Sequence, residues 1–276
     1  MDLIFFDLDG TLLNKSSQIS NFTKDTLALL AEKDIAYTVA TGRTMHSAQY
    51  VLQGTSFVLP HIYNNGVAIW DPTGNALTLE NLLAPSEVNA ILSCAHDNGI
   101  TPFINTVNLQ SQNHDHVIYH SEPKHNVERD LIDKYFSRTK AILEPAERLP
   151  LHANITNISM IGEANRIYGM YKELNAHEGL IAYSGPAIEG EEYRWMDVHH
   201  KLANKGSAVE ILKAQLGASN VICFGDSDND ISMFHLADEA YAPANAKAMI
   251  KEAATSVIGH HDEDGIARFL RERFSL

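Results

Sequence analysis

Two short apolar runs near opposite ends of the chain constrain its fold more than any other feature. Residues 3–6 (LIFF) and 221–224 (VICF) have the length and composition of strands that are buried on both faces. An acidic cluster follows each run, DLDGT at 7–11 and GDSDND at 225–230. Strands of this kind belong to parallel sheets, which gather polar groups at the carboxyl ends of their strands. We therefore expect both ends of the chain to share one sheet.

The segments around these runs alternate between strand and helix patterns. Asn21 is the predicted N-cap of a helix over 21–33, and the C-terminal stretch repeats the alternation. The other predicted elements are strands at 35–40 and 240–242 and helices at 45–53, 204–215, after 230, 246–254 and 263–274. This order implies a parallel sheet with helices on its faces. The expected fold class is α/β, with a Rossmann-like, doubly wound core.

The middle of the sequence follows a different pattern. Helical patterns at 86–98 and 125–136 are mixed with strand-like runs at 117–119, 155–161 and 180–183. We interpret residues 85–190 as an inserted α+β domain. Residues 1–84 and 191–276 are then the two parts of one core.

Composition excludes several classes of protein. The 276 residues are 45% hydrophobic, and 21 Lys and Arg against 35 Asp and Glu give a net charge of −14, unlike a general nucleic-acid surface or an anionic-membrane binder. No apolar run approaches the ~18 residues of a membrane-spanning helix, and the N-terminal residues lack the basic region of a signal peptide. Cys94 and Cys223, the only cysteines, form no metal or disulfide motif. The expected location is the cytoplasm; the oligomeric state is not predicted.

The two acidic clusters predict a metal site. Four or five carboxylates at one sheet edge would repel one another strongly, and a divalent cation removes that repulsion. Aspartate side chains, backbone carbonyls and water suit Mg²⁺. Thr41 and Gly42, after the second predicted strand, offer a hydroxyl and an unhindered N–H to an anion, and Lys205 offers a compact positive charge. Together these groups fit a phosphate.

Asp7 and Asp9 predict the chemistry. Attack of the Asp7 carboxylate on phosphorus would form an aspartyl-phosphate. Asp9, two residues later, could protonate the departing alkoxide and then deprotonate the attacking water. Arg43 either contacts substrate or pairs with a core carboxylate, and the sequence leaves both alternatives open. We interpret Asp228 as a charge at a helix start rather than a metal ligand.

Four motifs in order carry a family resemblance: residues 7–11, Thr41-Gly42, Lys205 and residues 225–230. They resemble the motifs of the haloacid dehalogenase-like (HAD) superfamily of phosphohydrolases. The long insertion, ATGR at 40–43, NNG at 64–66 and NKGSA at 204–208 resemble the Cof-type subgroup with a C2B cap. The resemblance implies that Asp7 is the nucleophile and Asp9 the acid/base. It implies a metal site formed by Asp7, the Asp9 carbonyl, Asp226 and Asp230, of which Asp230 orients metal-bound water. The phosphate-binding residues that it implies are Leu8 (backbone), Thr41, Gly42, Lys205 and Asn229.

The expected function is a magnesium-dependent hydrolase, a phosphatase acting on a small phosphorylated metabolite. The substrate class is a phosphomonoester such as a sugar phosphate or a phosphorylated cofactor. A phosphohexomutase and a non-catalytic phospho-aspartate switch are the alternatives. Neither GxxxxGK[ST] nor GxGxxG occurs, which disfavours nucleotide kinases and dehydrogenases. Specificity should reside in residues 85–190, where the sequence gives no recognisable code.

Overall fold

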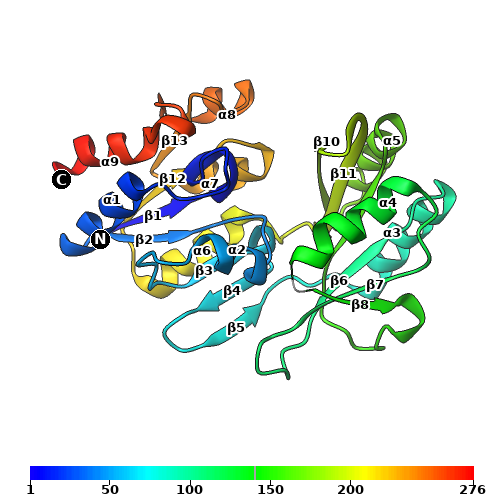
Figure 1. The fold of residues 1–276 in the computed structure, drawn as a ribbon. Coiled ribbons are helices and arrows are strands. Elements are labelled where there is room, and N and C mark those ends of the chain that lie inside the picture. The colour runs from blue at the N-terminus through cyan, green and yellow to red at the C-terminus, as the bar shows by residue number, and fades with distance from the viewer. Residues whose placement is uncertain (140) are drawn as a thin grey trace. The chain divides into compact units, whose positions relative to one another are not determined.

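The chain forms two compact units. A computed structural model describes residues 1–139 and 141–276 (Figure 1). The core unit comprises Met1–Glu80 and Asn204–Leu276, and the cap unit comprises Asn81–Ala203. The sequence pattern placed these divisions at 84/85 and 190/191. The second division falls at 203/204 because strand β11 (Gly190–His200) continues the sheet of the cap unit, pairing with two of its strands.

The core unit is built on a five-stranded parallel sheet in which the two apolar runs are neighbours. The strand order is β14-β13-β12-β1-β2. The bounds are β1 Asp2–Phe6, β2 Ala36–Val39, β12 Asn220–Phe224, β13 Glu239–Pro243 and β14 Ser256–Ile258. β1 pairs with β12 from Asp2 opposite Asn220 to Phe6 opposite Phe224. This register confirms that the ends of the chain share one sheet and places both acidic clusters at the same edge.

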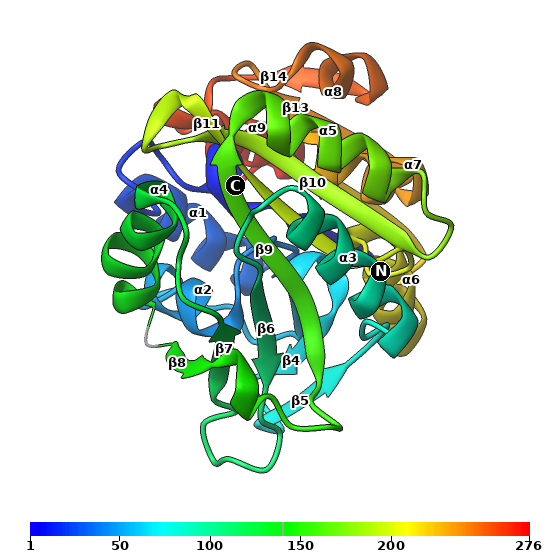
Figure 2. The ribbon, with the colours of Figure 1, turned by 90° about the vertical axis from the view of Figure 1, so that its right-hand side faces the viewer.

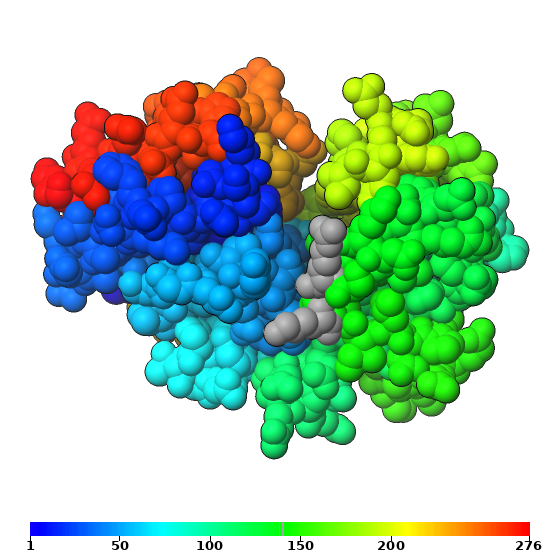
Figure 3. Space-filling model, in the orientation of Figure 1, coloured from blue at the N-terminus to red at the C-terminus, as the bar shows by residue number. Residues whose placement is uncertain are grey.

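Helices cover both faces of the core sheet. Their bounds are α1 Asn21–Glu32, α2 Met45–Val51, α6 Lys205–Leu216, α7 Ile231–Leu236, α8 Ala248–Ala253 and α9 Gly265–Phe274. Ile4 and Phe6 of β1 pack in one apolar cluster with α1, α2 and α9, while Leu3 and Phe5 pack in another with α6, α7 and α8. Figure 3 shows the blue N-terminal and the orange-to-red C-terminal segments side by side on this unit. The doubly wound arrangement is confirmed.

The N-cap of α1 differs from the prediction by one residue. Ser20, not Asn21, has the extended backbone of an N-cap, and its Oγ accepts a hydrogen bond of 3.0 Å from the Thr23 N–H. Both residue types can cap a helix, so sequence alone does not separate adjacent candidates.

A small antiparallel sheet, not predicted from the sequence, extends the core unit. It consists of β3 (His61–Tyr63), β4 (Ala68–Asp71) and β5 (Ala76–Leu79), in that order. Ile62 bridges to Ala40 just beyond β2, so the small sheet continues from the edge of the main one. Its β3–β4 turn, Asn64–Gly66, lies near the ends of the parallel strands.

The cap unit is an α+β domain with its own apolar core. Its six strands, in the order β10-β11-β9-β6-β7-β8, pair antiparallel except for β7 with β8. The remaining bounds are β6 Phe103–Val107, β7 His116–His120, β8 Ile142–Pro145, β9 Ile155–Glu163, β10 Leu180–Ala187, α3 Pro85–Asp97, α4 Asn126–Asp130 and α5 Ala164–Asn175. Helices α3 and α5 lie side by side over one sheet face (Figure 2). Across the described parts of both units, no helix has the length and apolar character needed to cross a membrane.

Candidate active site

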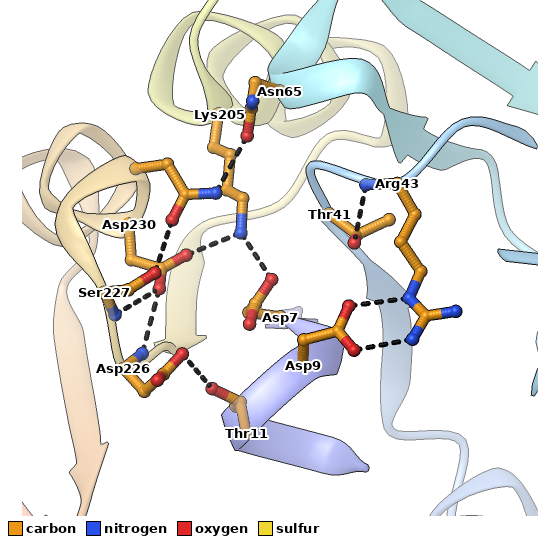
Figure 4. Close-up of polar contacts among 11 residues, drawn as sticks. Asp7, Asp9, Thr11, Thr41, Arg43, Asn65, Lys205, Asp226, Ser227 and Asp230 are labelled. Atoms are coloured by element: carbon orange, nitrogen blue, oxygen red, sulfur yellow. Dashed lines mark hydrogen bonds and ion pairs between the residues drawn. The ribbon is translucent and has the colours of Figure 1, made fainter. Parts of the chain in front are cut away.

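The two acidic turns meet at the carboxyl edge of the core sheet. Asp7 directly follows β1, and its N–H donates to the carbonyl of Phe224 at the end of β12. Asp7, Asp226 and Asp230 each present a carboxylate oxygen, and these three oxygens lie within 4.8 Å of one another (Figure 4). The structure thus brings together residues more than 200 positions apart in the sequence.

Lys205 lies between two of these carboxylates. Its Nζ is 2.5 Å from Asp7 Oδ1 and 2.6 Å from Asp230 Oδ1, and the residue is completely buried. Asn204 caps α6 by accepting the Ser207 N–H, which fixes Lys205 in the first turn. Burial lowers the pKa of Lys205, but Asp230 and Asp7 raise it by more, so the net pKa lies above its usual value. An ammonium has three donors, and the two carboxylates take two of them.

Asp230 is engaged on both carboxylate oxygens. Oδ1 accepts from Lys205, and Oδ2 accepts from the N–H groups of Asp226 and Ser227, each at 2.9 Å. The adjacent Gly225 leaves no room for a side chain, because a Cβ there would lie 2.5 Å from the Asp230 carboxyl carbon. Asp230 therefore holds the second acidic turn and Lys205 in place.

The charge balance of this cluster is suited to a cation. Burial raises the pKa of Asp7, and the Asp230 and Asp226 carboxylates add to the rise against the opposing Lys205. Burial likewise raises the pKa of Asp226 to about 6, with Asp230 contributing. Three carboxylates face one ammonium, and all the candidate ligand atoms are hard oxygens. Such a set fits Mg²⁺ rather than a softer metal.

A loop outside the motifs connects the two acidic turns. Gly10 has φ +74°, and a Cβ there would lie 2.5 Å from Asp226 Oδ2, so the turn requires glycine. Asn245 Nδ2 donates to the Gly10 carbonyl at 2.7 Å, while the Lys247 N–H donates to the Asp226 carbonyl at 3.1 Å. The segment before α8 thus fixes both turns. No spacing in the sequence singled out Asn245.

Arg43 pairs with the predicted acid/base. Its Nε and a terminal nitrogen each lie 2.6 Å from one of the two Asp9 carboxylate oxygens. The Asp9 side chain is 56% exposed and that of Arg43 only 20%, so the guanidinium is the more fixed partner. Of the two alternatives for Arg43, the structure shows the pairing, and the paired carboxylate is Asp9.

This pair predicts a selective effect of Arg43→Ala. Without the guanidinium group, the Asp9 side chain is no longer held in one orientation. We expect kcat/KM for an alkyl phosphate to fall about 10- to 100-fold. An aryl phosphate with an acidic leaving group needs little proton donation and should lose much less. Steady-state assays on the two esters measure the difference. Arg43→Lys keeps the positive charge but cannot donate two parallel hydrogen bonds, so its kcat/KM for the alkyl ester should lie between those of the wild type and Arg43→Ala. An equal loss on both esters in Arg43→Ala would contradict the positioning role.

The predicted phosphate-binding residues border the carboxylates. Thr41 is 1% exposed and its hydroxyl accepts the Arg43 N–H, whereas Gly42 is exposed. A Cβ on Gly42 would lie 3.5 Å from Asn229 Nδ2, which places Asn229 beside it. The Leu8 side chain is fully buried in the core, so only its backbone is available to a ligand.

Two further groups outside this cluster are explained by internal contacts. Asp228 pairs with Lys247 at 2.7 Å on the surface, consistent with its interpretation as a helix-start charge. His260, His261 and Asp262 also lie close enough to hold an ion. However, His260 Nδ1 already accepts the Asp262 N–H and Asp262 Oδ1 accepts the Lys15 N–H. These hydrogen bonds hold the 260–262 turn together and connect it to the loop at Lys15.

Comparisons with known proteins agree with this geometry. The sequence profile of a family described as haloacid dehalogenase-like hydrolase matches residues 4–270. The chain is 26% identical over 283 residues to the 5-amino-6-(5-phospho-D-ribitylamino)uracil phosphatase YitU of Bacillus subtilis, covering 99% of this chain and 98% of that one. It is 27% identical over 271 residues to the HMP-PP phosphatase of Cronobacter sakazakii, covering 96% and 93%.

The fold has close counterparts among solved structures. The HAD subclass IIB sugar phosphatase BT4131 superposes with a TM-score of 0.77 at 21% identity, covering all of this chain and 99% of the other. At that identity the likeness concerns the fold. The profile match spans nearly the whole chain, and the curated relatives are phosphatases. The chain therefore belongs to the haloacid dehalogenase-like hydrolase family.

Proposed function

We propose that the chain is a Mg²⁺-dependent phosphatase that hydrolyses a small phosphomonoester through an aspartyl-phosphate on Asp7. The observation that carries the proposal is the convergence of Asp7, Asp226 and Asp230 around Lys205, next to Thr41 and Gly42. Acidic groups, one buried ammonium and neutral donors meet at a single sheet edge. This arrangement suits an anion whose negative charge is neutralised by a lysine and a metal ion.

Asp7, Asp226 and the Asp9 carbonyl are the groups proposed to hold the ion. Asp230, both of whose oxygens accept hydrogen bonds from the protein, would hold Lys205 and the second acidic turn in place and orient water on the ion. When bound, Mg²⁺ would neutralise phosphoryl oxygens and lower the repulsion between the phosphate and the Asp7 carboxylate.

The chain's own residues account for both half-reactions. Lys205 holds one Asp7 oxygen and leaves the other to attack phosphorus. The ester bond breaks as Asp9, which enters this step in its protonated form, gives its proton to the departing alcohol oxygen. In the second step Asp9 removes a proton from water as it attacks phosphorus. The bond to Asp7 then breaks and inorganic phosphate leaves. The Thr41 hydroxyl, the Gly42 N–H, the Leu8 backbone, Lys205 and Asn229 hold the phosphoryl oxygens throughout.

The proposed substrate is a phosphorylated sugar or a phosphorylated cofactor or precursor. The name of the B. subtilis relative specifies a phosphorylated ribityl compound, and BT4131 is named a sugar phosphatase. A phosphate-release panel of sugar phosphates, pyridoxal phosphate, flavin mononucleotide, nucleotides and this ribityl compound tests the class. Release without a bisphosphate activator excludes the mutase, and turnover excludes a phospho-switch.

Metal removal tests the dependence on Mg²⁺. EDTA should abolish phosphate release, and excess Mg²⁺ should restore it, because the carboxylate cluster repels a phosphate when no cation is bound. Mg²⁺ added to the EDTA-treated protein should also raise its thermal unfolding midpoint. Ca²⁺ serves as a comparison, since it tolerates a looser, larger coordination shell and should support less turnover. Full activity in EDTA after exhaustive dialysis would refute the metal dependence.

A further inference from the structure

The β3–β4 turn holds a polar side chain beside the phosphate-binding groups. Asn64, Asn65 and Gly66 have φ values of +48°, +53° and +102°, a run of left-handed residues in which the first two carry side chains. Such conformations cost free energy in residues other than glycine and persist only where surrounding contacts impose them. Here the Asn64 N–H donates to the Arg43 carbonyl, and the Asn65 N–H donates to the Thr41 carbonyl.

These backbone bonds place the Asn65 amide at the phosphate-binding groups. Asn65 is 5% exposed, and a Cβ built on Gly42 would lie 3.1 Å from its Oδ1 and 3.4 Å from its Nδ2. A side chain at position 42 would therefore crowd the Asn65 amide, which would have to shift by a few tenths of an ångström. The Asn65 amide therefore lies next to the side of Gly42 on which a side chain would project.

The hydrogen bonds around Asn65 determine which end of its amide is available. Ser227 Oγ donates to Asn229 Oδ1 at 2.8 Å, so Asn229 presents Nδ2 to Asn65. Asn65 Oδ1 accepts that Nδ2 at 2.9 Å (Figure 4). This bond orients the amide, so its own Nδ2, with two N–H groups, is the end available to a partner that only accepts. A phosphoryl oxygen is such a partner.

We propose that Asn65 Nδ2 is a further donor to the phosphoryl group, alongside Thr41, Gly42, Lys205 and Asn229. The inference deepens, and rests on, the phosphatase function proposed above. A purely supporting role is the competing explanation, in which Asn65 does no more than hold Asn229. The two differ in whether the effect of Asn65 depends on Asn229 being present.

A double-mutant cycle on the full chain separates these roles. Asn65→Gly removes the side chain and keeps the left-handed backbone without strain, which alanine would not. Inorganic phosphate binding is measured by calorimetry with Mg²⁺ present for the wild type, Asn65→Gly, Asn229→Ala and the double variant. Losing a hydrogen bond to a charged group should raise the Kd of phosphate about tenfold or more. A direct donor gives this loss in the Asn229→Ala background as well.

The controls make each outcome decisive. Asn75→Gly makes the same change at an exposed left-handed residue (φ +49°) in the β4–β5 turn and should leave the phosphate Kd unchanged. Thermal unfolding midpoints establish that the variants fold. The inference is overturned if Asn65→Gly leaves the Kd unaltered, or if its effect vanishes in the Asn229→Ala background. A wild type that neither binds phosphate nor releases it contradicts the proposed function as well.

Discussion

Asp7→Asn should reduce phosphate release by roughly 10⁴-fold or more while the protein remains folded. The amide is nearly isosteric with the carboxylate but cannot form the acyl phosphate, and Lys205 keeps its second partner, Asp230. Phosphate release at saturating substrate and Mg²⁺ measures the loss. Rapid quenching of the wild type should also trap a phosphoenzyme that the variant lacks.

Asp228→Asn provides the matched control for the nucleophile. It makes the same chemical change two residues from Asp226, at a side chain that pairs with Lys247 on the surface. Exposed pairs contribute little, so turnover should stay within about twofold of wild type. Undiminished activity in Asp7→Asn, with purity checked by mass spectrometry, would defeat the assignment of the nucleophile.

Lys205→Met should abolish activity and destabilise the core unit by roughly 3–5 kcal/mol. Lys205 is completely buried between Asp7 and Asp230, and its removal leaves two buried carboxylates without their counter-charge. Methionine preserves most of the apolar stem, so the change isolates the ammonium. Chemical denaturation gives the free energy of unfolding, and phosphate release gives the activity.

Lys213→Met is the matched control on the same helix. Lys213 pairs with Asp238 at 3.7 Å, and its side chain is 33% exposed, so the same substitution should cost less than about 1 kcal/mol and leave turnover unchanged. A Lys205→Met protein as stable as the Lys213→Met protein would contradict the account of Lys205 as the counter-charge of the site.

The core could be predicted because its signals are local. The apolar runs at β1 and β12 identify buried strands, and the acidic residues directly after them need only the rule that parallel strands end at a common edge. The small sheet β3–β5 and the strands β6, β8, β11 and β14 escaped prediction. β11 pairs with β10 and β9 inside the cap unit, and a strand's sheet membership depends on distant partners that periodicity does not reveal.

The missed site residues share the same physical origin. Asn245 has no acidic or glycine-rich context, and its role arises only because the segment before α8 reaches the Gly10 carbonyl. Asn65 carried a signal in the NNG sequence, since asparagine and glycine tolerate left-handed backbones. The pattern predicts a turn, and only the fold shows that the turn lies against Thr41. Arg43 could not be assigned because its partner, Asp9, lies 34 residues away.

The order of strands in the core sheet has a consequence for biosynthesis. β1 is made first, yet its neighbour β12 and the site residues Lys205 and Asp226 are synthesised only after the whole cap unit. Domains generally fold as units, and synthesis starts at the N-terminus. We therefore expect the cap unit to fold before β12 is available to pair with β1. Nascent chains that end near residue 203 should be inactive, and the side of β1 that normally pairs with β12 would be exposed, which should make them substrates of chaperones.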